Sequence, residues 1–285
     1  MRKHNERSWW RNRAPVIIAS LIAISAAAQT PRQVRAAGAV QATEDEPPAK
    51  IIIEAPLATP LSHGRVVVPY RTENLHLTPV FGPAALKISP RVGHVHVSVD
   101  DAPWVWMDAS GEPLIVNGLL PGPHKILLRL QSANHQLLDE GVVNVTIPEA
   151  PSGTAGPERA NDEPGPATVE TRQNEPPPRL IVASPLPEPL ARGVVFIRYR
   201  TENLQILPVF GPAAVAVSPR LGHIHVTVDD TTWHWVDASG GPVIINGLRP
   251  GRHKIFIQLV NANGSPLDET TVQVEVPQVK QRAAY

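Results

Sequence analysis

The sequence contains no cysteine among its 285 residues, and this absence excludes several kinds of site. Without thiols the chain can form no disulfide, no thiolate nucleophile and no cysteine-based zinc or blue-copper centre. An excess of positive charge is lacking too, because 26 Lys and Arg stand against 26 Asp and Glu. Recognition of nucleic-acid phosphates needs a basic surface, so this balance argues against a nucleic-acid partner.

Catalytic motifs are also missing. The sequence has no GxSxG, no HExxH and no P-loop pattern. A hydrolase would need His94, Asp108 and a nucleophile to meet, and the nearest serine, Ser110, lies in an expected turn. We therefore predict a protein that is not an enzyme, with no catalytic residues.

The N-terminus has the pattern of a secretory signal peptide. Five basic residues precede the uncharged run APVIIASLIAISAAA at 14–28. This run is shorter than the roughly 20 residues of a membrane-spanning helix, and it ends in an A-x-A cleavage pattern. We expect export to a bacterial periplasm or out of the cell, with no membrane span after cleavage; an uncleaved anchor is the alternative.

An internal duplication organises the rest of the chain. The segment RTENLHLTPVFGPAALKISPRVGHVHVSVDD at 71–101 returns as RTENLQILPVFGPAAVAVSPRLGHIHVTVDD at 200–230, and WVWMDASG at 104–111 returns as WHWVDASG at 233–240. The offset is a constant 129 residues, as between His94 and His223. Two tandem copies of one domain are therefore expected.

The segments before the first copy and between the two copies are rich in proline and acidic residues and contain few large apolar side chains. Such segments cannot bury enough surface to offset their ordering entropy, so we expect disorder. The predicted division is a signal peptide at 1–28, a disordered segment at 29–49, repeat 1 at 50–148, a linker at 149–178, repeat 2 at 179–278 and a tail at 279–285.

Within each repeat, short β-branched runs alternate with turn sequences. This pattern, without any helical period, predicts an all-β fold of two tandem immunoglobulin-like β-sandwich domains joined by a disordered linker. The strands expected in repeat 1 are 66–71, 94–99, 104–108, 114–117, 124–130 and 142–147.

Alternation along HVHVSV at 94–99 places the valines on a core face and the histidines on the other face. A four-residue loop to the next strand then directs Trp104 and Trp106 into the core. A loop of odd length would reverse them. The residue between the two tryptophans is Val105 in the first copy and His234 in the second. A position that accepts histidine suits a solvent face better than a core, so we expect Trp104 and Trp106 to point inward.

The pairs His94 and His96, and His223 and His225, are the clearest candidate site. Two histidines at i and i+2 on a strand project from the same face, which suits two imidazole ligands of one Cu or Zn ion. Met107 is expected opposite His96, so a third ligand is not evident. The alternative is that these histidines bond only to neighbouring side chains on a half-exposed sheet.

Other candidates have ordinary explanations. His124 and His253 follow PGP and PGR turns and are expected to be buried, hydrogen-bonded turn residues. The tryptophans form a sugar-binding platform only if they are exposed.

Three aspartates of repeat 1 are candidates for Ca²⁺ ligation, although Asp-Asp and Asp-Ala-Ser-Gly are also typical of turns. They are Asp100, Asp101 and Asp108.

By the residues GH(V/I)HVxVDD, WxWxDASG and GLxPGxHKI, each repeat resembles an uncharacterised family of exported bacterial proteins, a domain of unknown function. The resemblance implies an exported, immunoglobulin-like domain and supplies no catalytic residues. Most members carry one copy, so the tandem form is a departure.

These observations predict an exported, non-enzymatic binding protein of the bacterial envelope without a cofactor. Its partner is an unknown protein or small ligand, bound bivalently by two modules on a flexible tether. The alternative is a periplasmic Cu- or Zn-binding protein that uses His94, His96, His223 and His225.

Overall fold

A computed structural model describes residues 47–79, 91–149, 175–211, 214, 218 and 220–278 of the chain. The predicted signal peptide, most of the predicted disordered segment, most of the predicted linker and the whole predicted tail lie outside these residues. Within them, neither of the two helices has the length and apolar character needed to cross a membrane.

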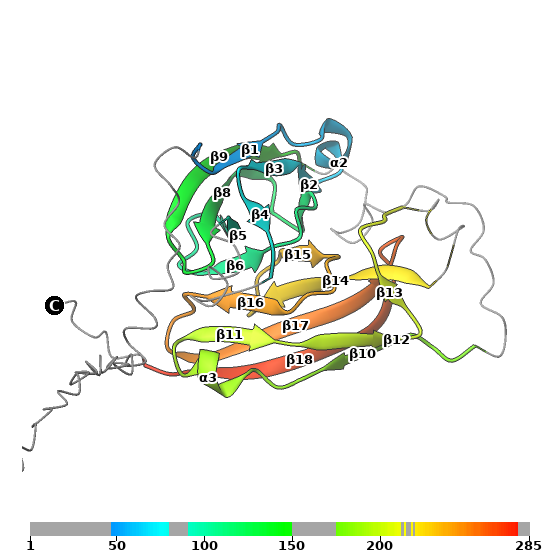
Figure 1. The fold of residues 1–285 in the computed structure, drawn as a ribbon. Helices are drawn as coiled ribbons and strands as arrows, with labels where there is room; N and C mark the ends of the chain where they lie inside the picture. Colours follow the sequence, from blue (N-terminus) through cyan, green and yellow to red (C-terminus); the bar gives the residue numbers. More distant parts are fainter. Residues whose placement is uncertain are drawn as a thin grey trace, which may run out of the picture.

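The regular structure of both repeats is mostly strand (Figure 1). Repeat 1 contains β1 (Lys50–Ile53), α2 (Ala58–Ser62), β2 (Val66–Val68), β3 (Tyr70–Glu73), β4 (His76–Leu77), β5 (Val92–Val99), β6 (Val105–Asp108), β7 (Leu114–Asn117), β8 (Gly122–Ser132) and β9 (Leu137–Ile147). Repeat 2 contains β10 (Arg179–Val182), α3 (Pro187–Leu190), β11 (Val194–Ile197), β12 (Tyr199–Glu202), β13 (Gln205–Ile206), β14 (Leu221–Val228), β15 (His234–Asp237), β16 (Val243–Asn246), β17 (Gly251–Asn261) and β18 (Pro266–Val276).

The all-β class and the tandem arrangement are confirmed, and each run of repeat 1 that was expected to be extended forms a strand. The sequence did not predict the two short helices. Each helix is a single turn that begins beside a proline-containing segment and buries none of its residues.

Strands of the two repeats are shared between the main sheets, which the sequence did not predict. One seven-stranded sheet has the order β11-β16-β6-β5-β8-β9, with β4 also paired to β5. The other has the order β18-β17-β14-β15-β7-β2, with β13 paired to β14. Thus β7 and β2 of repeat 1 complete the sheet of repeat 2, and β16 and β11 make the reciprocal exchange. The pairs β1-β3 and β10-β12 form two small sheets.

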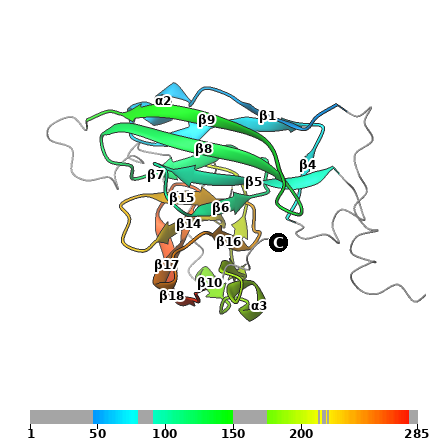
Figure 2. The same ribbon diagram turned by 90° about the vertical axis from the view of Figure 1, so that its left-hand side faces the viewer.

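Figure 2 shows the consequence for the arrangement of the strands. β8 and β9 run across this view, whereas β17 and β18 of the second repeat are seen close to end-on below them. β6, β15 and β16 lie between the two sets, where the repeats meet. The repeats therefore form one folded body rather than two modules that act separately on a tether.

Two glycines mark the points where the chain crosses between the repeats. Gly118 follows β7 with φ +77°, and a Cβ atom there would lie 2.5 Å from the carbonyl oxygen of Thr232. Gly247 follows β16 with φ +86°, and its Cβ would lie 2.6 Å from the carbonyl oxygen of Pro103. Only glycine combines this backbone conformation with so close an approach.

The four tryptophans of the WxW sequences stack in pairs across the repeat boundary. Trp104 stacks on Trp233 with ring centroids 5.5 Å apart, and Trp106 stacks on Trp235 at 5.0 Å. Trp106 and Trp235 are 2% and 3% exposed, so the inward orientation predicted for the tryptophans of repeat 1 is confirmed. The register also agrees, because Val97 pairs with Trp106.

The apolar core is continuous across both repeats. Val95, Val97 and Val99 of β5 pack in the same cluster as Ile126, Leu128 and Leu130 of β8 and their counterparts in repeat 2. This single cluster explains how two repeats of modest size obtain a common core.

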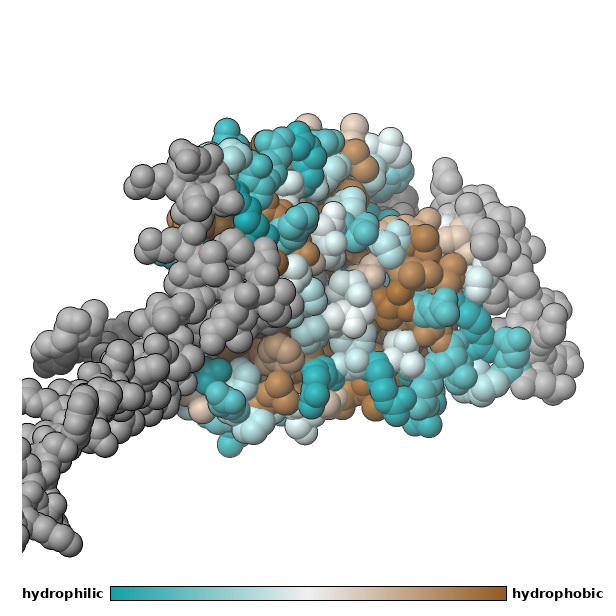
Figure 3. Space-filling model, viewed as in Figure 1, coloured by the Kyte–Doolittle hydropathy of each residue, from teal (hydrophilic) through white to brown (hydrophobic). Residues whose placement is uncertain are grey.

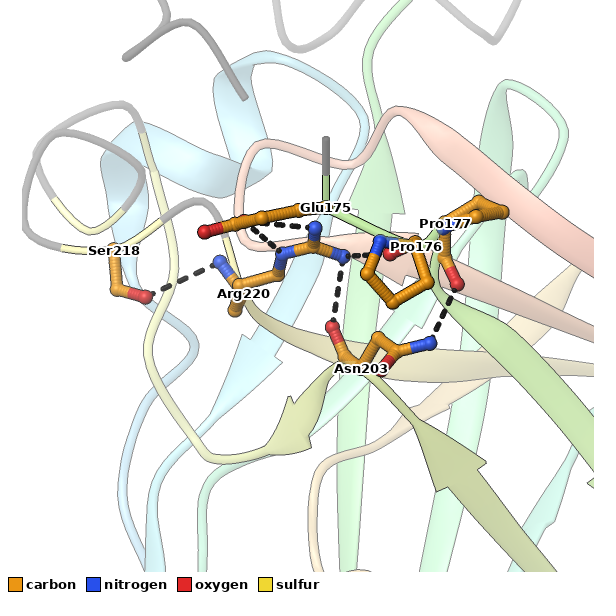
Figure 4. Close-up of polar contacts among 6 residues, drawn as sticks. All are labelled: Glu175, Pro176, Pro177, Asn203, Ser218 and Arg220. Carbon is orange, nitrogen blue, oxygen red and sulfur yellow. Dashed lines mark hydrogen bonds and ion pairs between the residues drawn. The ribbon is translucent and has the colours of Figure 1, made fainter. Parts of the chain in front are cut away.

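An arginine in each repeat ties the start of that repeat to the loop before its histidine strand. Arg220 donates to the carboxylate of Glu175 and to the carbonyl oxygens of Pro176 and Asn203 (Figure 4). Arg91 donates in the same way to the carbonyl oxygens of Pro47 and Asn74. The hydrogen bonds of Arg91 and Arg220 lie at corresponding positions of the two repeats and hold chain segments together.

Candidate metal centre

The local sequence GHxH shapes the strand that carries the histidines of repeat 1. A Cβ atom on Gly93 would collide with the carbonyl oxygen of Gln131 on β8, so glycine is required for β5 and β8 to approach. Alternation along β5 then places His94 and His96 on the face opposite the valine core.

His94 and His96 meet as predicted. Their Nε2 atoms lie 3.0 Å apart and their ring centroids 4.9 Å apart. Two imidazole nitrogens on one tetrahedral Zn²⁺, each at roughly 2.0–2.1 Å, lie roughly 3.3 Å apart, so the pair is nearly in ligating geometry. The expected half-exposed sheet face is wrong for this pair, since His94 is 0% and His96 6% exposed.

His135 is the third histidine at this site, and the sequence analysis did not identify it as a ligand. It lies in the turn between β8 and β9, which is held by bonds from the Ser132 amide to the Gln136 carbonyl and from the His135 amide to the Ser132 carbonyl. The His135 ring centroid is 5.0 Å from that of His94 and 5.4 Å from that of His96. One ligand atom from each of the three side chains lies within 4.8 Å of the others.

The site holds its histidines neutral. Burial lowers the pKa of His94 to about 3, with further contributions from His96 and His135. Burial also lowers the pKa of His96 to about 4, helped by His135 and by the positive charge of Arg129. The pKa of His135 is lowered by burial as well. Neutral imidazole is the form that ligates metals, so protons compete weakly for this site.

Two neighbours flank His96 on the adjacent strands. Met107 of β6 pairs with His96 on one side, as the sequence predicted, and Arg129 of β8 pairs with it on the other. Residues directly opposite each other in antiparallel strands project from the same face. A thioether and a guanidinium therefore border the histidine face, and the guanidinium of Arg129 is bonded to Glu140 at 3.1 Å.

Two buried oxygens near His94 lack a hydrogen-bond partner among the described residues. Gln131 pairs with His94, and its Oε1 atom is buried without a partner. The Oγ1 atom of Thr78 is also buried without a partner among the described residues. Thr78 lies close to His94, because its amide donates to the carbonyl of Gly93, the residue before His94. A buried polar atom of this kind is costly unless water or a ligand satisfies it.

The second repeat builds a different site around the same pair. His223 and His225 lie with ring centroids 5.1 Å apart, and His234 stacks on His225 at 4.3 Å. The Nε2 atom of His234 lies 3.3 Å from Nδ2 of Asn117, which belongs to repeat 1. The prediction that His234 faces solvent is therefore wrong: it faces away from the tryptophans but is packed between His225 and the exchanged strand β7.

A positive charge from repeat 1 lies close to this second site. Burial, with contributions from Arg65 and His234, lowers the pKa of His223 to about 3. Burial and Arg65 lower the pKa of His234 to about 4, and the pKa of His225 falls well below its usual value. Among the described residues, the only group of three or more metal-ligand side chains is His94, His96 and His135.

The turn histidines are hydrogen-bonded as predicted, but each is only partly buried, with 13% of its side chain exposed. Nδ1 of His124 lies 2.7 Å from the carboxylate of Asp100, and its Nε2 lies 2.7 Å from the carbonyl oxygen of Leu120. His253 makes the equivalent contacts with Asp229 and Arg249. In both cases the bond to aspartate raises the pKa of the imidazole against the effect of burial.

The aspartates of repeat 1 are engaged in separate contacts rather than gathered around one position. Asp101 contacts Lys125, and Asp108 accepts hydrogen bonds from the hydroxyls of Tyr70 and Ser110. The bond between Asp108 and Ser110 belongs to a turn. A hydrolase would need His94 beside Asp108 and a nucleophile, but the contacts described for His94 are with His96 and His135.

A groove of about 370 Å³ lies where the repeats meet and is lined by both DASG turns, Trp106, Trp235 and Phe210. Figure 3 shows hydrophobic surface on the side of the molecule where β13 and β14 lie. Trp104, Trp106 and Trp235 are buried and the partly buried Trp233 is stacked on Trp104, so these rings do not offer the flat exposed platform that sugar binding requires.

Fold and site together define an all-β protein of two interlocked repeats with a cluster of three histidines in the first, two of them buried and one exposed. The chain belongs to a family described as a family of unknown function (DUF6130), whose model matches twice, at residues 10–157 and 152–285. No curated protein matches the chain.

Proposed function

We propose that this protein is an exported, non-enzymatic binding protein for a transition-metal ion, copper or zinc, held in repeat 1 by His94, His96 and His135. Three imidazoles without a cysteine form a recognised ligand set for these ions. The proposal replaces four histidines in two equivalent pairs with one three-histidine centre, and it assigns His223 and His225 no ligand role.

The backbone of His135 is the observation that carries this proposal. His135 has φ +64°, a left-handed conformation that is unfavourable for a residue with a side chain. At the corresponding turn position repeat 2 has Gly264, with φ +84°. Since glycine suits this turn better, a histidine there is explained by what its side chain does, and its ring closes the cluster with His94 and His96.

The exposure of the three histidines supports reversible access by an ion. His94 and His96 are buried and His135 is exposed, so an ion can enter from the side of the β8–β9 turn. The unpartnered oxygens of Gln131 and Thr78 offer hydrogen-bond acceptors to a water molecule bound with the ion.

Titration calorimetry of the metal-free protein with Zn²⁺ and Cu²⁺ tests the proposal. We expect one ion per chain and a loss of affinity of more than about 100-fold in the His94→Ala/His96→Ala variant, because removing ligands exceeds the 10–100-fold cost of losing their hydrogen-bond partners. His135→Gly, which copies repeat 2 and leaves the buried pair intact, should give a similar loss.

The matched control is His223→Ala/His225→Ala. This variant removes the same residues from the same strand of the other repeat, and we expect wild-type stoichiometry and affinity. Equal losses in both double variants, or weak binding that none of the substitutions changes, contradict the proposal.

The shared sheets bear on the alternative of bivalent binding. Avidity through a tether requires modules that move independently, whereas β7 and β16 are paired into the opposite repeat. The structure therefore favours a single site over two equivalent ones.

A further inference from the structure

We infer that the three-histidine centre is selective for monovalent copper and that the thioether of Met107 is its fourth ligand. This inference rests on the proposed function, because it takes His94, His96 and His135 as the other ligands. It adds a ligand role for Met107, to which the proposed function assigns none.

The position of Met107 supplies the first argument. Met107 is the cross-strand partner of His96, and the Cβ atoms of such partners are roughly 4.5–5.5 Å apart on the same face of the sheet. The flexible side chain of methionine can span that distance to an ion bound at the imidazole of His96. Thioether sulfur is a soft donor, and soft donors favour Cu(I) over harder divalent ions.

Charge supplies the second argument. The histidine cluster contains no carboxylate, and two of its three side chains are buried. The Born cost of burying an ion rises with the square of its charge, so a divalent ion costs about four times as much as a monovalent one. The guanidinium of Arg129, which faces His96 from β8, opposes additional positive charge.

The second repeat provides a natural comparison for Met107. The position is Val236 there, and it pairs with His225 in the same register. Met107→Val is therefore a substitution that this strand accommodates in the other repeat. Met107 is also one of only two methionines in the chain, and the other is Met1.

Anaerobic competition of the full chain against a colorimetric Cu(I) chelator, beside calorimetry with Zn²⁺, tests the inference. Met107→Val should lower the affinity for Cu(I) about tenfold or more and leave that for Zn²⁺ within about twofold, because sulfur contributes mainly to the soft ion. Met107→Leu preserves side-chain volume and should give the same result. In selenomethionine-labelled protein, X-ray absorption at the copper edge should show a selenium neighbour that Met107→Val removes.

The outcomes separate this inference from the proposed function. If Zn²⁺ binds through His94, His96 and His135 but Met107→Val leaves Cu(I) affinity unchanged, or no selenium neighbour is seen, the role of Met107 is refuted and the metal site stands. The inference also fails if Met107→Val weakens both ions equally. If neither ion binds the wild-type protein, the proposed function itself fails.

Discussion

His94 and His96 in repeat 1 occupy the same positions of the same strand as His223 and His225 in repeat 2, yet the two pairs have different surroundings. In repeat 1 the pair is joined by a third imidazole and bordered by groups that can act as ligands. In repeat 2 it is joined by His234 and approached by Arg65 of the other repeat. The positions that differ around the pairs include Thr78, Met107, Gln131 and His135, which correspond to Leu207, Val236, Val260 and Gly264.

Under the proposed function, an HxH pair alone is not sufficient for a metal centre. Both pairs satisfy the spacing rule for two ligands, and partial or complete burial lowers the pKa of all four histidines. What distinguishes them is the convergence of a third ligand: His135 converges with the pair in repeat 1, whereas among the described residues no third metal-ligand side chain converges with His223 and His225. The stacked rings of Trp104, Trp106, Trp233 and Trp235, here called the tryptophan seam, are by contrast the same in both repeats. Substitutions at three places test where the halves agree and where they differ.

The largest effect is expected at the seam, where the repeats agree. Trp106→Ala and Trp235→Ala should each lower the free energy of unfolding by about 3–5 kcal/mol, because each removes a buried indole that stacks on the other. Since the core is common, each variant should unfold both repeats in a single transition during denaturant titration. Two separate transitions, or very unequal losses, would show that the halves are energetically independent. Trp106→Phe offers a milder change if the alanine variant does not fold.

An intermediate effect is expected at the paired aspartates of the two repeats. The Tyr70 hydroxyl donates to Asp108 at 2.9 Å, whereas the buried hydroxyl of Tyr199 has no hydrogen-bond partner among the described residues. Burial raises the pKa of Asp237 from 3.8 to about 6. The folded state therefore binds this proton more tightly than the unfolded state, and stability falls as pH rises from about 4 to about 6.

Asp237→Asn should remove that fall and raise the free energy of unfolding by about 1–3 kcal/mol at pH 7. Urea titrations at pH 4 and pH 7 measure it, with Asp108→Asn as the matched variant, for which we expect no gain. An Asp237→Asn protein that shows the wild-type difference between the two pH values would refute this assignment.

The smallest effect is expected at the turn that carries His135. Without metal, His135→Gly should raise the free energy of unfolding by about 0.5–1 kcal/mol, because glycine adopts the left-handed conformation without the penalty of a side chain. Gly264→Ala in repeat 2 should lower it by a similar amount. Urea titration in the presence of a chelator measures both, and a loss of stability in His135→Gly would mean that the ring stabilises the fold without an ion.

Much of the fold follows from local sequence pattern. Alternation along 94–99 and the length of the loop to Trp104 determine the register of β5 and β6, since both depend on residues close in the chain. The exchange of β7 and β16 could not be predicted in this way. The two copies have similar sequences in these strands, so a strand from either repeat fits either sheet, and no local preference distinguishes the partners.

The candidate site was predictable to a lesser extent. The HxH spacing identified His94 and His96 because both lie on one strand. His135 is distant in sequence and sits in a polar turn, where an exposed histidine is ordinary. The sequence did contain a signal: one turn position is His135 in the first copy but Gly264 in the second. His234 was misplaced because the strand that covers it, β7, comes from the other repeat.

The exchange of strands has a consequence for how such a protein can change over evolutionary time. In a dimer of identical subunits every substitution appears twice, so both halves must keep the same surface. Here one polypeptide contains both halves, so a substitution can affect only one of them, as the difference between His135 and Gly264 illustrates. The second copy can then differ from the first around its histidine pair and still be retained, because its strands β16 and β11 complete the sheet that carries the histidine cluster of the first.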